Sequence, residues 1–243
     1  MVAKRELKFI KSLHQKKHRS LSGFFLAEGV KVVETLMDAG WEPRQLYSTS
    51  ATGNFPTAEL ISEKELKSVS TLKQPNQVLG VFKIPPERPP EYSGWVLALD
   101  RLNDPGNLGT IIRLCDWFGI REILCSPDSV DCYNPKVVMA SMGSLAQVQV
   151  HYLPLGPALS ESGLSVFGAD MDGVSVSAFS FPDEGILLMG SESHGISPDL
   201  RASLTQSLNI RPFANPGAES LNVGVATGIL LYELRKQQPF TQK

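Results

Sequence analysis

Three short stretches of this 243-residue chain combine glycine with polar side chains that could orient a ligand or a reacting group. They are LDRLNDPGNLGTIIR (99–113), MGSESHGISP (189–198) and RPFANPGAESLN (211–222). Glycine lets a backbone turn sharply or approach a ligand closely, and amide, carboxylate and hydroxyl groups hold substrates through hydrogen bonds. Each stretch taken singly is an ordinary turn with a helix cap. Three of them in one chain indicate a binding or catalytic site.

The elements around these stretches are those of an α/β domain. We predict strands at 95–100, 121–126, 146–152, 164–170, 185–190 and 207–211, and helices at 107–119, 134–141, 197–204 and about 221–236. Such alternation is typical of a largely parallel sheet covered by helices on both faces. Ligands in these folds bind at the carboxyl ends of the strands, which is where all three stretches lie.

The first 84 residues predict a smaller α/β unit. We expect helices at 4–17, 29–39 and 63–70, and strands at 24–29, 45–49, 58–62 and 77–84. The segment that follows holds four prolines between Pro85 and Pro90, so neither a helix nor a central strand can run through it. We therefore divide the chain into an N-terminal domain (1–84), a linker (85–93) and a second domain (94–243).

Charge is distributed unevenly along the chain. The net charge is −2, but residues 1–92 carry +4 and residues 93–243 carry −6. The first twenty residues are strongly basic, and we take four of them as candidate nucleic-acid contacts: Lys11, Lys16, Lys17 and Arg19. A basic arm favours a polyanionic partner, nucleic acid first; a solvated helix face is the alternative.

Other features exclude several classes of protein. No apolar run reaches membrane-spanning length and the basic N-terminus is unlike a signal peptide, so we predict a cytoplasmic protein with no membrane partner. The cysteines Cys115, Cys125 and Cys132 form no CxxC pair and are predicted to be core thiols. The histidines are scattered, and no metal site is predicted. NDPGNLG lacks the GxGxxG spacing of a dinucleotide-binding loop.

Taken together, NDPGNLGTIIR, MGSESHG and AESLNVGVATGILLYE resemble the three motifs of the SPOUT-class RNA ribose 2′-O-methyltransferases, the SpoU/TrmH family. The resemblance spans roughly 94–238. It implies a deep trefoil knot, S-adenosylmethionine bound in that knot without metal, and a homodimer. Residues 1–84 resemble the family's N-terminal substrate-binding domain, which is related to ribosomal RNA-binding proteins. That domain favours ribosomal RNA over transfer RNA as the substrate.

The resemblance also assigns site residues. Positions matching the catalytic set are Arg113, Asn107, Glu192, Ser220 and Asn222, and positions matching the cofactor contacts are Gly190, Ile210 and Leu221. Because arginine is not readily deprotonated, we expect Arg113 to hold a substrate phosphate and the attacking oxygen rather than to act as a simple base. Asn107 and Ser220 could alternatively cap helices. Valine at Gly190 is expected to block the cofactor and leave the fold intact.

Two other functions remain open at this point. A non-catalytic RNA-binding or ribosome-associated protein could keep the knotted fold, although the complete polar set argues against it. A nucleotide-dependent oxidoreductase on an open α/β sheet is the other, but the chain lacks the glycine fingerprint of that class. His194 invites interpretation as a base, but its place in the second motif is variable in the family, and we expect it to lie on the surface.

Overall fold

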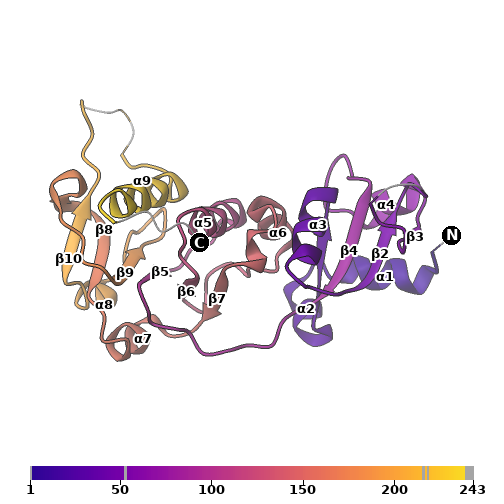
Figure 1. The fold of residues 1–243 in the computed structure, drawn as a ribbon, viewed down its shortest axis with the longest axis horizontal. Coiled ribbons are helices and arrows are strands. Elements are labelled where there is room, and N and C mark those ends of the chain that lie inside the picture. The colour runs from indigo at the N-terminus through magenta and orange to yellow at the C-terminus, as the bar shows by residue number, and fades with distance from the viewer. Residues whose placement is uncertain (1, 52–53, 215–216, 218, 239–243) are drawn as a thin grey trace. The chain divides into compact units, whose positions relative to one another are not determined.

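A computed structural model of the chain describes residues 2–51, 54–214, 217 and 219–238 (Figure 1). The chain forms two compact units. The N-terminal unit comprises Met1–Glu87 together with Asp131–Gln147, and the second unit comprises Arg88–Val130 together with Val148–Lys243. Residues 131–147, which the sequence placed in the second domain, therefore pack with the N-terminal residues.

The N-terminal unit is built on a four-stranded sheet of order β1-β4-β2-β3. β4 pairs antiparallel with both β1 and β2, and β2 pairs parallel with β3. Its strands are β1 (Phe24–Glu28), β2 (Pro43–Ser48), β3 (Glu59–Leu60) and β4 (Val78–Lys83). Its first four helices are α1 (Lys4–Ser12), α2 (Lys16–Ser22), α3 (Val30–Asp38) and α4 (Glu63–Val69).

The single helix expected at 4–17 is two helices in the structure. α1 ends at Ser12, and Gln15 is extended (φ −97°, ψ 133°) before α2 begins. The last carbonyls of a helix lack intrahelical donors. Here Nη1 of the Arg19 guanidinium donates to Leu13 O (2.8 Å) and His14 O (3.0 Å), so an arginine from α2 stabilises the break.

Residues 131–147 join the N-terminal unit through an apolar face. They form α6 (Pro135–Ser141) and the short 3₁₀ helix η1 (Ser144–Ala146). α6 packs against β1 and buries Val137 and Val138. The ring of Tyr133 lies 5.0 Å from that of Phe25, centroid to centroid. Burial of this surface explains why the segment folds with a unit that is distant in sequence.

The second unit contains a six-stranded sheet of order β10-β8-β9-β5-β6-β7 in which every pairing is parallel, as predicted. Its strands are β5 (Trp95–Leu99), β6 (Glu122–Cys125), β7 (Gln149–Tyr152), β8 (Val166–Ser175), β9 (Gly185–Met189) and β10 (Gln206–Asn209). Its helices are α5 (Pro105–Trp117), α7 (Leu155–Glu161), α8 (Pro198–Arg201), α9 (Val223–Lys236) and the 3₁₀ helix η2 (Val176–Ala178). The sequence did not predict α7, because Gly156 and Pro157 in its first turn obscure the helical pattern.

The strand order locates the ligand-binding edge of the second unit. From β5 the chain moves outward to β6 and β7, whereas β9, β8 and β10 lie on the other side of β5. Such a reversal opens a crevice at the carboxyl ends of the central strands. The loops after β5, β9 and β10 all leave from this edge, and α5 and α9 pack against each other beside it (Figure 1). Within the described residues, no helix has both the length and the apolar character needed to span a membrane.

Candidate active site

The loops that follow β5 and β9 are joined by a buried carboxylate. Asp100 is 3% exposed, and its backbone N–H donates to Met189 O (2.9 Å). Its Oδ2 accepts the N–H of Ser197 (2.7 Å), and its Oδ1 accepts Nε–H of Arg101 (3.2 Å). Asp100 therefore fixes the first loop to the second. Asp100 was not among the predicted site residues, although an acidic residue at the end of an apolar strand was a usable signal.

Arg101 reinforces the same junction. Its backbone lies in the left-handed region (φ 55°), which is uncommon for a residue with a side chain. The conformation is held by Ser126 Oγ, which accepts the Arg101 N–H at 2.8 Å. The Arg101 side chain donates from Nη2 to Gly195 O (3.3 Å) and to Asp100 Oδ2 (3.3 Å). A strained residue fixed by several hydrogen bonds is typical of a functional loop.

Gly190 is required by the shape of the second loop. The loop folds back so that Ser191 and Gly195 exchange backbone hydrogen bonds of 3.1 and 2.9 Å. A Cβ added at Gly190 would lie 2.1 Å from the carbonyl carbon of Gly195 and 2.2 Å from the nitrogen of Ile196. Both neighbours are backbone atoms that cannot rotate away. The expectation that valine at Gly190 would leave the fold intact is therefore wrong for this loop.

Three of the predicted catalytic residues form a continuous hydrogen-bond chain, which we call the loop network: Glu192, Asn107 and Asn222. Asn107 Nδ2 donates to Glu192 Oε1 (2.7 Å), and Asn222 Nδ2 donates to Asn107 Oδ1 (2.9 Å). Each residue comes from a different loop–helix junction. The carboxyl ends of parallel strands lie at one edge of the sheet. The three loops that follow these strands are therefore close enough for their side chains to form the network.

The helix caps at this edge differ from those expected. Asp104, not Asn107, caps α5, because its Oδ1 accepts the N–H of Asn107 at 2.8 Å. Asn222, not Ser220, caps α9 through Oδ1, which accepts the N–H groups of Gly224 (2.9 Å) and Val225 (3.2 Å). The Asn107 side chain is thus left for the loop network, and the Asn222 amide serves the cap and the network at once.

The remaining residues of the predicted site are not joined to the loop network by described contacts. Ser220 is exposed, Leu221 is 50% exposed, and Ile210 is half-buried just after β10. Residues 215, 216 and 218 of the loop between them lie outside the described residues. His194 is exposed, as expected; its backbone N–H donates to Ser191 Oγ (3.2 Å).

Arg113 is exposed on α5 and makes no hydrogen bond or ion pair with any described residue. It lies six residues after Asn107. At about 100° per residue, the two side chains leave the helix roughly 120° apart. Arg113 is therefore open to a phosphate, whereas Asn107 is directed to its neighbouring loops.

The cysteines and the charged clusters offer no alternative chemistry in the part of the chain that the structure describes. Cys115, Cys125 and Cys132 are buried thiols that form no disulfide among the described residues, as predicted. Burial raises the pKa of the Cys115 and Cys125 thiols well above the usual range, so both stay protonated and unreactive. No group of three His, Cys, Asp or Glu side chains suited to a metal occurs among the described residues.

The four predicted RNA contacts separate into two kinds. Lys11, Lys16 and Lys17 are exposed on α1 and α2. Arg19 is 2% exposed and forms an ion pair with Asp131 (Nη2 to Oδ2, 2.5 Å) in addition to its bonds at the end of α1. The assignment of Arg19 to RNA is therefore wrong: its guanidinium is used inside the N-terminal unit.

A parallel α/β sheet whose central loops meet in a network of amides and a carboxylate is typical of a domain that binds a ligand at the carboxyl ends of its strands. A family model described as the SpoU rRNA Methylase family matches residues 94–232, and one described as the MRM3-like substrate binding domain matches residues 4–80. The chain therefore belongs to the SpoU rRNA Methylase family, which confirms the resemblance seen in its three motifs and makes it a methyltransferase.

Similarity to individual proteins extends over almost the whole chain. The 23S rRNA (guanosine(2553)-2′-O)-methyltransferase RlmP of Bacillus subtilis is 28% identical, with 93% of this chain and 94% of that protein covered. A TrmH-family RNA methyltransferase structure from Porphyromonas gingivalis has a TM-score of 0.86 and 38% identity, covering 98% of this chain and 100% of its own. The AdoMet-bound rRNA methyltransferase structure from Sinorhizobium meliloti has a TM-score of 0.86 and 29% identity, covering 99% and 97%.

Proposed function

We propose that this protein transfers a methyl group from S-adenosylmethionine to a ribose 2′-hydroxyl of structured RNA, with ribosomal RNA favoured over transfer RNA. The observation that carries the proposal is the loop network, in which Glu192, Asn107 and Asn222 meet by hydrogen bonds of 2.7 and 2.9 Å. These residues match catalytic positions of the family motifs. The relatives described above, one named as a ribose methyltransferase and one crystallised with AdoMet, support the reaction and the methyl donor.

The carboxyl edge of the second unit fits such a methyl donor. At Gly190 the loop is folded so tightly on the backbone of Gly195 and Ile196 that it admits no side chain, so its backbone groups would act as fixed donors and acceptors toward the cofactor. Ile210 and Leu221 offer partly exposed apolar side chains that could cover an adenine. Bound S-adenosylmethionine would supply a methyl group activated by a positively charged sulfur.

The chain's own residues then have separate tasks. The bond that forms joins the ribose oxygen to the methyl carbon, the bond that breaks is carbon–sulfur, and a neutral thioether leaves. Alignment of the oxygen is the main requirement of such a displacement. Arg113 would clamp a substrate phosphate and the attacking oxygen through its planar fork and favour the ionised hydroxyl. The hydroxyl proton passes to the phosphate or to water, while the loop network holds the three loops in register.

Several features support the family's homodimer and knot for this chain. Val225, Ile229 and Tyr232 are partly or largely exposed at i, i+4 and i+7 along α9, and Trp117 on α5 is 83% exposed. Apolar stripes of this kind mark protein interfaces. Arg113 lies one helical turn from Trp117, at the margin of that surface. The knot is proposed from the family match, and in it α9 would be held to the end of α5 by Arg235, whose Nε donates to Phe118 O (2.7 Å).

In this proposal the N-terminal unit binds the RNA. Its match to a substrate-binding domain and the exposed lysines at positions 11, 16 and 17 support that role. Phosphate contacts by such lysines supply affinity without reading sequence. The location that follows from these tasks is the cytoplasm, where the RNA and the methyl donor are both present.

Isothermal titration calorimetry tests the cofactor half of the proposal. S-adenosylmethionine and S-adenosylhomocysteine should bind at one site per chain, with neither RNA nor metal added. Chelator in the buffer should change nothing. No heat of binding at millimolar cofactor would defeat the proposal.

A further inference from the structure

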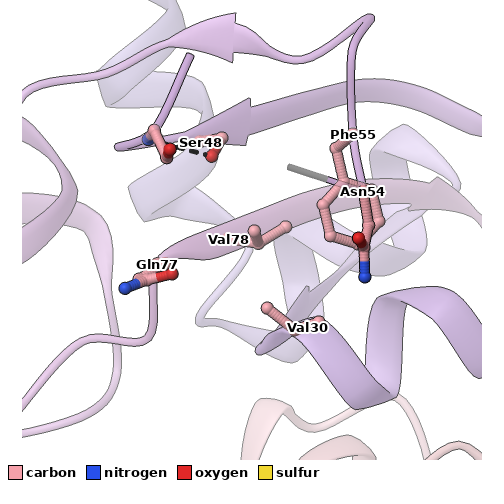
Figure 2. Close-up of a pocket in the computed structure, with 7 residues that line it drawn as sticks. Val30, Ser48, Asn54, Phe55, Gln77 and Val78 are labelled. Carbon is pink, nitrogen blue, oxygen red and sulfur yellow. Dashed lines mark hydrogen bonds between the residues drawn. The ribbon is translucent and has the colours of Figure 1, made fainter. Parts of the chain in front are cut away.

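The N-terminal unit contains a small open cavity that includes none of the predicted catalytic or phosphate-binding residues. Its volume is about 160 Å³, and it lies where β2 ends, β4 begins and α3 starts. The lining residues are Val30, Ser48, Ser50, Asn54, Phe55, Gln77 and Val78. Figure 2 shows Ser48 and Gln77 on one side and Asn54 and Phe55 on the other, with Val30 and Val78 between them.

The lining combines polar and apolar side chains, includes one aromatic ring and contains no charged residue. Gln77 forms no side-chain hydrogen bond with any described residue, so its amide can both donate and accept. Asn54 donates Nδ2–H to Glu34 Oε1 on α3, which fixes the orientation of its amide. Ser48 Oγ accepts the N–H of Ser50 at 3.1 Å. An aromatic face beside amide groups suits a flat, neutral group with donors and acceptors on its edge.

The volume of the cavity limits the size of the ligand that it can bind. Sites for whole small molecules have volumes of roughly 300–1,000 Å³, so this cavity would take one ring system rather than a complete cofactor. Proteins that read RNA sequence bind unpaired bases in this way, with the face stacked on an aromatic side chain and the edge hydrogen-bonded.

The surroundings of the cavity suit the backbone of such a nucleotide. Val30 is the first residue of α3, and the first intrahelical bond of that helix runs from Val33 N–H to Gly29 O (3.1 Å). The amides of Val30, Lys31 and Val32 therefore have no intrahelical acceptor and point from the positive end of the helix dipole. The Lys31 side chain is exposed next to them. A phosphate at this rim would accompany a base in the cavity.

We propose that this cavity binds one unpaired base of the substrate RNA, with Phe55 stacking on the base and Gln77 hydrogen-bonding to its edge. The inference rests on the proposed function, because it takes the ligand to be part of the RNA. It adds a sequence-reading site to a unit whose exposed lysines recognise only phosphate.

The direct test is a methyl NMR titration of the full-length protein labelled at valine methyl groups, since Val30 and Val78 line the cavity. The probes are the four nucleoside 5′-monophosphates and ribose 5-phosphate, each added with saturating S-adenosylhomocysteine to occupy the cofactor site. At least one nucleotide should shift the Val78 signal saturably. Ribose 5-phosphate can place only its phosphate at the rim beside Val30, so it should leave Val78 unshifted. Equal Val78 shifts with ribose 5-phosphate, or no Val78 shift with any nucleotide, would overturn the proposal.

Variants separate stacking from simple packing. Phe55→Leu keeps apolar volume but removes the ring, and should weaken nucleotide binding about 5- to 100-fold, the usual range for a base stacked on an aromatic side chain. Phe55→Tyr should retain binding. Gln77→Ala should weaken it, whereas Gln74→Ala, an exposed glutamine three residues earlier, should not. Equal binding by Phe55→Leu and wild type would contradict the assignment.

Cofactor binding and methyl transfer distinguish this inference from the proposed function. If Phe55→Leu binds S-adenosylhomocysteine normally but methylates ribosomal RNA poorly, both stand. If it methylates as well as the wild type, the base site is wrong and the proposed function is untouched. If the wild type itself neither binds cofactor nor transfers methyl, the proposed function fails whatever the cavity binds.

Discussion

The basic helices of the N-terminal unit and the loop edge of the second unit use polar side chains in opposite ways. On α1 and α2, the lysines at positions 11, 16 and 17 are exposed, whereas Arg19 is buried in an ion pair. At the loop edge, the amides and the carboxylate of Glu192, Asn107 and Asn222 bond to one another. Exposed charges attract a polyanion over a distance, whereas linked groups hold a fixed geometry. Affinity for RNA and alignment of the reaction should therefore be separable by mutation.

Arg113→Ala should produce the largest effect and the sharpest separation. If Arg113 acts on the hydroxyl and phosphate, turnover should fall by about 10²- to 10⁴-fold, with cofactor affinity unchanged. Arg113→Lys should lose turnover as well, because the point charge of an ammonium group cannot replace the planar, forked guanidinium. Single-turnover methyl transfer measures the loss. Arg121→Ala, which removes a surface arginine that forms an ion pair with Asp116, is the control. Comparable losses of turnover in both variants would contradict a specific role of Arg113.

Arg19→Ala should affect stability instead of chemistry. Removing the guanidinium leaves Asp131 unpaired and the carbonyls of Leu13 and His14 without a donor, so the free energy of unfolding should fall by about 3–5 kcal/mol. Urea denaturation measures the change. The double variant Arg19→Met/Asp131→Leu should recover part of the loss, because no unpaired charge remains. A stable Arg19→Ala protein with weakened RNA binding would restore Arg19 to the phosphate-contacting group.

Gly190→Ala should abolish cofactor binding without touching the basic helices. The added Cβ collides with the backbone of Gly195 and Ile196, so the loop must move away from the position that Asp100 and Arg101 hold. Cofactor affinity should fall by about 100-fold or more, and thermal stability should fall modestly. Calorimetry with S-adenosylhomocysteine measures the cofactor affinity, and a melting curve measures the thermal stability. Normal cofactor affinity would remove Gly190 from the site.

Replacing Lys11, Lys16 and Lys17 with Ala should give the smallest change. The slope of log K against log salt should flatten by up to about 0.9 for each lost duplex phosphate contact. Cofactor binding should be unaffected. The matched control replaces Lys64, Lys67 and Lys83, three exposed lysines elsewhere in the N-terminal unit. If both triple variants change the slope equally, the charge of α1 and α2 is only a solvated face.

The sequence predicted the parallel sheet and the three loops because buried strands and glycine-bearing junctions leave local patterns. It did not predict the break after Ser12, which depends on a guanidinium arriving from α2. It also missed the packing of residues 131–147 with the N-terminal unit, since that depends on burial against β1. Within the site, Asn107, Glu192 and Asn222 could be selected from motifs, but their mutual hydrogen bonds depend on strand order. Asp100 was missed because its role is to join its own loop to Ser197, which lies 97 residues further along the chain.

The central claim is that the carboxyl edge of the second unit directs methyl transfer to a ribose oxygen. Ribosomal RNA from cells lacking this protein should be incubated with purified protein and methyl-labelled S-adenosylmethionine, then digested to nucleosides and analysed by mass spectrometry. We predict label on a ribose 2′-oxygen with the wild type and none with Arg113→Ala. Label on a base, or no transfer to this RNA by a wild-type protein that binds the cofactor, would contradict the account.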